Sequence, residues 1–286
     1  MKIKIQSFLL TCLAVLFTAS ITSAQVAEST GLPGENFSLE GALELFKKAE
    51  SPEAFEKLLN TADNHVNNLD LNDDGDIDYV RVVDNMDGDV HAIVLQVAVS
   101  ETESQDVAVI EVEKTGKEEA ILQIIGDEDV YGDQTIVEPF ETEAKENGKN
   151  GPHVTVARVV VNVWGWPSVR FVYAPGYRVW VSPWRWRHYP VYWSPWRPHP
   201  FHVWHPFSVR HRPHYHVVTT HRVVRAHAVY TPHRAGSTTV RTHTTVVKGR
   251  NGAVKKSTKT TTVRGKNGNV KAKKKTTTVH GKRRGG

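Results

Sequence analysis

The sequence predicts an α+β fold: two N-terminal helices packed on an antiparallel β meander, followed by an irregular Trp/Pro/His/Arg-rich segment and a basic low-complexity tail. Apolar residues first recur at helical spacing, and β-branched runs separated by turn signals come next. This periodicity ends near residue 163, where Trp and Pro become frequent. Pro at such density is unsuited to helices and central strands, so the folded domain is expected to end there.

The first 24 residues have the pattern of a secretory signal peptide. A positive start at residues 1–4 precedes an apolar run at 8–17 and small residues at 22–24. The apolar run is shorter than the roughly 20 residues that a membrane-spanning helix needs. We therefore expect cleavage after Ala24 and export to the periplasm, the cell envelope or the extracellular space. The single cysteine, Cys12, would be removed, which excludes disulfides and a Cys nucleophile.

Charge is divided along the chain. All 31 Asp and Glu residues lie between Glu28 and Glu146, so residues 25–151 have a net charge of −23 and residues 152–286 of +26 before His is counted. All eight Trp residues and twelve of the 15 His residues lie after residue 163. Such a division predicts two regions that attract each other in a salt-dependent way. The attraction would act within one chain or produce self-association.

Residues 25–35 are predicted to be a linker and residues 36–163 a folded acidic domain that includes the calcium loop described next. Ser38 is a suitable N-cap for a first helix, and Ser51 is a suitable cap for a second helix that begins Ser-Pro-Glu. Apolar residues recur at helical spacing in both. The second helix is expected to run to about Asn68.

Five strands are predicted in the rest of the domain. An Asp-Gly turn joins residues 79–84 to 90–99, a Gly-containing turn joins 104–114 to 119–125, and 154–163 is a further apolar strand. A domain of roughly 125 residues is large enough to bury its own core. An acidic cluster follows the fourth strand, and its irregular spacing favours a solvated loop over a second cation site: Asp127, Glu128, Asp129 and Asp133.

The most specific motif is the acidic loop at residues 70–78. Oxygen-bearing side chains stand at every second position, and Gly75 is the sixth residue, where a loop that wraps an ion must turn sharply. Ca²⁺ takes six to eight oxygen ligands at about 2.3–2.6 Å, and one short loop with this spacing supplies most of them. The alternative is an acidic turn that holds no ion. The predicted Ca²⁺ ligands are Asp70, Asn72, Asp74, Asp76 and Asp78.

This loop resembles the Ca²⁺ loops of EF-hands and the D-x-D-x-D-G-x-x-D loops of FG-GAP-type repeats, over about a dozen residues. The EF-hand pattern has a bidentate Glu at position 12, where this chain has Arg81, and β-branched residues follow in place of a second helix. The second half of an EF-hand is therefore missing, and Asp78 would replace the Glu. We expect weak binding, in the extracellular range of roughly 10⁻⁴–10⁻³ M.

Residues 164–207 contain Ser-Pro-Trp-Arg twice and place aromatic side chains beside Arg and Pro. An extended segment of this kind would present aromatic rings and guanidinium groups to sugars, to bases or to a membrane interface. A second hypothesis is that the aromatic residues cover one side of the acidic domain and enlarge its core. A third hypothesis is disorder.

Histidine is concentrated around the end of this segment. Neutral imidazole is a common ligand of Zn²⁺, Ni²⁺ and Cu²⁺. No carboxylate or thiolate accompanies these residues and Arg is interleaved, so the alternative is a weakly basic surface that responds to pH. The candidate transition-metal ligands are His199, His202, His205, His214 and His216.

Residues 208–286 are predicted to be a basic His/Thr/Lys-rich tail with a 16-residue repeat. Gly249, Gly265 and Gly281 mark the repeat, and Asn-Gly pairs between Thr/Val runs are hairpin signals. The runs offer little to bury, so we expect a tail that is disordered alone and β-paired on a polyanion. The predicted polyanion-binding residues are Lys255, Lys256, Lys273, Lys274, Lys275, Arg283 and Arg284.

The sequence contains no G-x-S-x-G, no H-E-x-x-H and no phosphate-binding Gly-rich loop, so an enzyme is not predicted. The layout resembles that of uncharacterised secreted bacterial proteins, a resemblance that implies no activity. We expect a secreted or envelope Ca²⁺-binding module whose basic aromatic tail attaches to an anionic envelope polymer, a polysaccharide or lipid head groups. A genomic nucleic-acid target is not expected. The alternative is a periplasmic protein that handles transition metals through its His-rich segment.

Overall fold

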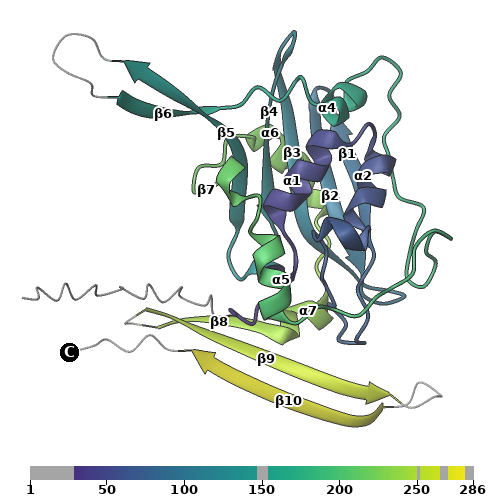
Figure 1. Ribbon diagram of the computed structural model, residues 1–286. Helices are drawn as coiled ribbons and strands as arrows, with labels where there is room; N and C mark the ends of the chain where they lie inside the picture. Colours follow the sequence, from purple (N-terminus) through teal and green to yellow (C-terminus); the bar gives the residue numbers. More distant parts are fainter. Residues whose placement is uncertain (1–28, 147–153, 250–251, 265–269, 281–286) are drawn as a thin grey trace, which may run out of the picture.

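The computed structural model of the protein describes residues 29–146, 154–249, 252–264 and 270–280 (Figure 1). The predicted signal peptide lies outside the described residues, as do Arg283 and Arg284. In the described ranges, no helix combines the length and the apolar character that crossing a membrane requires.

The centre of the molecule is a seven-stranded antiparallel sheet, which confirms the predicted α+β class. Six strands follow one another across the sheet in chain order, and the seventh pairs with β5. Gly88 turns between the first two strands at a φ of +58°, as Asp-Gly chemistry predicts. The strands are β1 (Val80–Asp87), β2 (Val90–Ala98), β3 (Ser104–Gly116), β4 (Glu119–Gly126), β5 (Thr135–Glu146), β6 (Val154–Val160) and β7 (Tyr215–Val218).

Short helices connect and cover these strands. Both predicted caps are confirmed, since Ser38 accepts an N–H from Gly41 at 3.0 Å and Ser51 accepts one from Ala54 at 3.1 Å. The second helix ends at Leu59, earlier than predicted, and a 3₁₀ turn follows it. The elements are η1 (Pro33–Asn36), α1 (Leu39–Lys48), α2 (Pro52–Leu59), η2 (Ala62–Asn64), α3 (Glu128–Tyr131), α4 (Pro167–Val172), α5 (Phe201–Ser208), η3 (Arg212–His214), α6 (Val224–Tyr230), η4 (Thr231–His233) and α7 (Thr238–His243).

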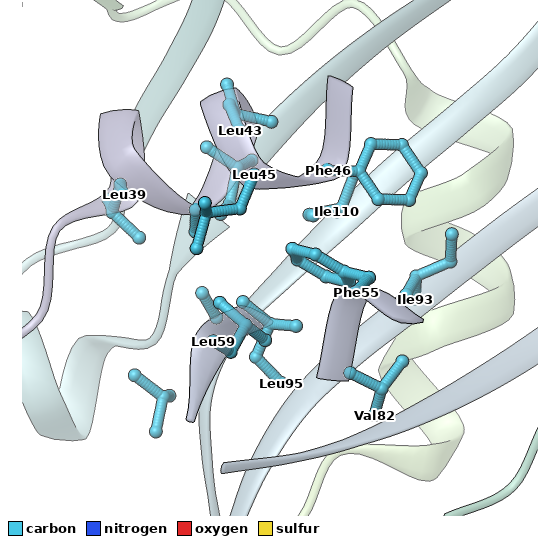
Figure 2. Close-up of a cluster of buried hydrophobic side chains, with 14 of the residues drawn as sticks. Leu39, Leu43, Leu45, Phe46, Phe55, Leu59, Val82, Ile93, Leu95 and Ile110 are labelled. Atoms are coloured by element: carbon cyan, nitrogen blue, oxygen red, sulfur yellow. The ribbon is translucent and has the colours of Figure 1, made fainter. Parts of the chain in front are cut away.

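The main core lies between one face of the sheet and the helices α1, α2 and α4. Phe46 of α1 and Phe55 of α2 meet edge to face with ring centroids 5.2 Å apart, above apolar side chains of β2 and β3 (Figure 2). The opposite face is covered by α6, whose Tyr230 packs against Val94 and Val109. Residues far apart in the sequence therefore enclose the sheet from both sides.

The ordered structure extends well beyond residue 163, where the sequence placed the end of the domain. Trp166, Trp193 and Trp204 are buried, which agrees with the hypothesis that aromatic residues enlarge the core. Residues of the predicted tail are also buried, among them Ala226 and Val240. This extension was not predicted, because the segment docks through polar side chains and has few apolar residues at a regular spacing.

A separate three-stranded antiparallel sheet follows, below the main sheet in Figure 1. Its strands are β8 (Thr244–Gly249), β9 (Gly252–Arg264) and β10 (Val270–His280). The Asn-Gly hairpin signals predict this strand pairing. The prediction that the tail is disordered alone does not agree with it.

Trp204 is the largest fully buried side chain, and its indole N–H donates to the carbonyl of Glu35 at 2.8 Å. We expect Trp204→Ala to lower the free energy of unfolding by about 3–5 kcal/mol, because it leaves a cavity where α5 meets η1. The neighbouring Val203→Ala, on the exposed side of α5, should change it by no more than about 0.5 kcal/mol. Urea denaturation measures both. Equal effects would mean that α5 is not anchored by the indole.

Candidate functional site

The predicted Ca²⁺ loop lies between η2 and β1 and is fixed at its C-terminal end. Asp78 is buried; its N–H donates to the carbonyl of Leu69 at 2.8 Å and its Oδ2 accepts the N–H of Leu71 at 2.6 Å. The N–H of Ile77 donates to the carbonyl of Trp196 at 2.7 Å. The loop therefore connects the acidic domain to the Trp-rich segment.

Most of the predicted ligand oxygens face the inside of the loop. Asp70 Oδ1 and Asn72 Oδ1 accept the same N–H, that of Asp74, at 3.0 and 2.9 Å. Asp70 Oδ2 accepts the N–H of Gly75 at 3.0 Å, and Asp74 Oδ1 accepts that of Asp76 at 3.0 Å. Gly75 has a φ of +90°, which suits the sharp turn expected at the sixth position.

The loop concentrates negative charge in a partly buried place. Burial raises the pKa of Asp70 to about 6, and the charges of Asp73 and Asp74 add to this effect. Burial likewise raises the pKa of Asp78 well above its usual range. A bound cation would reverse both effects, because it stabilises the ionised form of each carboxylate.

The loop carboxylates are not close enough to one another to form a complete coordination sphere. Throughout the described ranges, the one group of three His, Asp or Glu ligand atoms within 4.8 Å of one another lies elsewhere, at Glu111, His221 and His227. Binding of Ca²⁺ would therefore draw the loop side chains together, and Ca²⁺ ligation by the loop stays a prediction.

The five histidines proposed as transition-metal ligands are likewise not gathered by the structure. His202 and His205 lie on α5 and His214 on η3, while His216 of β7 stacks on Phe140 with ring centroids 3.9 Å apart. His199 is exposed and is held through its backbone N–H, which donates to Asn68 at 2.8 Å.

A different His cluster, which sequence reasoning missed, lies on the α6 face of the sheet. His221 Nε2 is 2.6 Å from Glu111 Oε2, and His227 Nδ1 is 2.7 Å from Glu111 Oε1. The two imidazole rings meet edge to face with centroids 4.6 Å apart. Glu111 is completely buried, whereas both His side chains are partly exposed. No local motif signals this group, because Glu111 and the two histidines are more than 100 residues apart in the chain.

The acidic cluster after β4 is not a solvated loop. Asp127 is buried and caps α3, and it accepts two bonds from the guanidinium of Arg234, at 2.7 and 3.0 Å. Asp129 accepts from Arg234 and Arg241 at 3.0 Å each. The expected attraction between the acidic and basic regions is thus present as ion pairs within one chain.

The predicted polyanion-binding lysines lie on two paired strands. Lys255 and Lys256 belong to β9, and residues 273–275 belong to β10. The register of these strands aligns Lys255 with His280 and Lys256 with Val279. Backbone pairing therefore brings lysines from successive repeats into one small sheet.

The cluster at Glu111 predicts a pH-dependent stability. Burial, with the charge of Glu113 adding to it, raises the pKa of Glu111 from 4.5 to about 9, so the folded protein keeps a proton that the unfolded chain loses. The free energy of unfolding should fall as the pH rises from about 7 to about 9, by at most about 1.4 kcal/mol per pH unit. Burial lowers the pKa of His221 and of His227 below their ordinary value of 6.5. These two residues therefore raise the free energy of unfolding as the pH rises toward 6.5, and they add no further pH dependence above it.

Glu111→Gln should make this slope shallower, and the exposed Glu128→Gln should leave it unchanged. The measurement is urea denaturation at several pH values in the presence of a chelator. A slope in Glu111→Gln equal to that of the wild-type chain would show that Glu111 is ionised in the folded protein.

Comparison of the chain with protein-family models, with curated proteins and with solved structures found no match.

Proposed function

We propose that the protein is an exported, non-enzymatic binding module, stabilised by Ca²⁺, whose basic C-terminal region attaches to an anionic polymer or surface. The observation that supports the Ca²⁺ site is the inward orientation of the Asp70, Asn72 and Asp74 oxygens around Gly75. The second half of an EF-hand is replaced by β1, so Asp78 completes the ligand set in this proposal.

The position of the loop suggests what the ion would do. The end of the loop contacts the Trp-rich segment through Ile77, and the next residue after the loop does so through Tyr79, whose ring meets that of Trp193 at a centroid distance of 5.0 Å. A cation that holds the loop would therefore also hold the Trp-rich segment against the helices α1 and α2 and the sheet. Ca²⁺ is a structural ion in this proposal.

The distribution of charge along the chain supports the attachment role of the tail. Several arginines between residues 208 and 243 form ion pairs with carboxylates of the acidic domain, as Arg222 does with Glu138 and Arg234 with Asp127. Residues 244–286 contain 14 Lys and Arg and no Asp or Glu. This surplus has no acidic neighbours in its own sheet, so an anionic polymer, a polysaccharide or lipid head groups would supply the counter-charge.

Self-association at low salt belongs to the same proposal. The tail of one molecule would meet acidic groups of another when the Debye length is long, about 30 Å at 0.01 M salt. An anionic polymer would compete for the same lysines. A genomic nucleic-acid target is not part of the proposal, because the chain is proposed to be exported.

Ca²⁺ should raise the melting temperature of the full chain, and Mg²⁺ should do so less because it demands tighter octahedral geometry. Asp74→Ala should remove most of the Ca²⁺ effect, because it removes a ligand oxygen. The exposed Asp63→Ala, outside the loop, is the matched control. Differential scanning calorimetry across a Ca²⁺ series up to several times 1 mM, roughly the weak end of such sites, measures the effect. A melting curve that does not move would reduce the loop to an acidic turn.

Heparin, used as the anionic probe, should bind the full chain with an affinity that falls steeply with salt, because each contact releases counterions. Replacing Lys273, Lys274 and Lys275 together by Gln should weaken binding and make the salt dependence shallower. The same replacement at Lys47, Lys48 and Lys57, in the acidic domain, is the control. Heparin-column elution measures both. Identical elution of the two triple variants would place the polymer contact outside β10.

A further inference from the structure

Three side chains from separate parts of the chain meet on the α6 face of the sheet: Glu111, His221 and His227. Glu111 belongs to the central strand β3, His221 precedes α6, and His227 lies within α6. Two imidazoles and one carboxylate are the protein donors of many Zn²⁺ sites that keep a position open for water or a ligand. We propose that Glu111, His221 and His227 form a binding site for a divalent transition metal, with Zn²⁺ as the ion that the donor set fits.

The first support is that one buried side chain forms hydrogen bonds with the backbone of both neighbours of His221. Gln123 of β4, the residue paired with Glu111 across the sheet, accepts the N–H of Arg222 at 2.8 Å. Its Nε2 donates to the carbonyl of Thr220 at 2.9 Å. The backbone before and after His221 is therefore fixed, and this limits where its imidazole can lie.

His227 is positioned by the neighbouring carboxylate on the same strand. Glu113 Oε1 accepts the N–H groups of Arg225 at 2.7 Å and of Ala226 at 3.0 Å, at the beginning of α6. This places the first turn of α6 against β3 and brings His227 over Glu111. Two buried groups that are not ligands thus orient the two histidines, as outer groups do in established metal sites.

The electrostatic environment also suits a cation. Glu111 is completely buried and Glu113 nearly so, and among the described residues neither forms an ion pair with a Lys or Arg side chain. A buried carboxylate without a permanently charged partner is costly, and a divalent ion held by Glu111 would compensate both. Solvent can reach the site from the His side, because His227 also lines a surface cavity of about 200 Å³ with Tyr230 and Arg234.

Metal binding requires only a small opening of the cluster. The nitrogen–oxygen separations of 2.6 and 2.7 Å are hydrogen-bond distances, so a proton now bridges each pair. Ligand atoms at about 2.0–2.2 Å from a tetrahedral Zn²⁺ stand roughly 3.3 Å apart. The ion would therefore replace the bridging protons, and each nitrogen–oxygen pair would open from hydrogen-bond distance to roughly 3.3 Å.

The test is a calorimetric titration of the full chain with Zn²⁺ in a competing chelator that suppresses weak sites. The wild-type chain should bind one equivalent, and Glu111→Gln, His221→Gln and His227→Gln should each weaken it at least about tenfold. Glu111→Gln keeps the shape of the cluster, so it tests the proposal even where a His variant unfolds. Co²⁺ in place of Zn²⁺ should give the intense visible absorption of a tetrahedral centre in the wild-type chain and not in Glu111→Gln.

Two controls separate this site from the rest of the molecule. His233→Gln, on the exposed η4 turn next to α6, and the triple variant His199→Gln, His202→Gln, His205→Gln should both retain the tight equivalent. Asp74→Ala should also retain it, so failure of the Ca²⁺ proposal and failure of this one are distinguishable. Tight Zn²⁺ binding that Glu111→Gln leaves unchanged, or that the triple variant removes, would overturn the assignment. So would the absence of a tight equivalent in the wild-type chain.

Discussion

The burial of carboxylates in the sheet is the constraint on which the rest of the structure depends. Asp106 and Glu111 of β3 and Asp127 after β4 are buried on the α6 side. Each finds its partners in residues 221–241: Asp106 accepts the hydroxyl of Tyr230, Glu111 contacts two imidazoles, and Asp127 accepts a guanidinium. A carboxylate left without such a partner would cost several kcal/mol, so the sheet and the segment that covers it form together.

The same principle operates on the other face. Glu56 of α2 is buried and accepts bonds from Tyr79 Oη at 2.9 Å, from the N–H of Val82 at 2.8 Å and from Ser182 Oγ at 2.9 Å. One carboxylate thereby joins a helix, a strand and the Trp-rich segment. Burial raises the pKa of Glu56 and these donors lower it. The hydrogen bonds therefore offset part of the free-energy cost of burying the carboxylate. Polar contacts, more than apolar periodicity, attach the second half of the chain on both faces.

This explains which elements could be predicted from the sequence. The caps at Ser38 and Ser51 and the turn at Gly88 are set by neighbouring residues, and all three were predicted. Strand β5 was not, because Pro139 and several Glu residues interrupt its pattern and its pairing with β7 is distant in sequence. The oxygens of the calcium loop are a local motif and were identified. The group at Glu111 could not be, since it depends on the register that brings Gln123 beside β3 and on where α6 begins.

The position of the covering segment along the chain has a consequence for biogenesis. The strands β1 to β4 emerge from the ribosome before residues 215–241 do. Until then the sheet lacks the arginine, imidazole and hydroxyl groups that its buried carboxylates need, and the contacts to be formed span more than 100 residues. Such distant closure is slow, so the acidic domain cannot complete its fold while synthesis is under way. The sheet therefore stays incomplete until the segment that covers it has been synthesised.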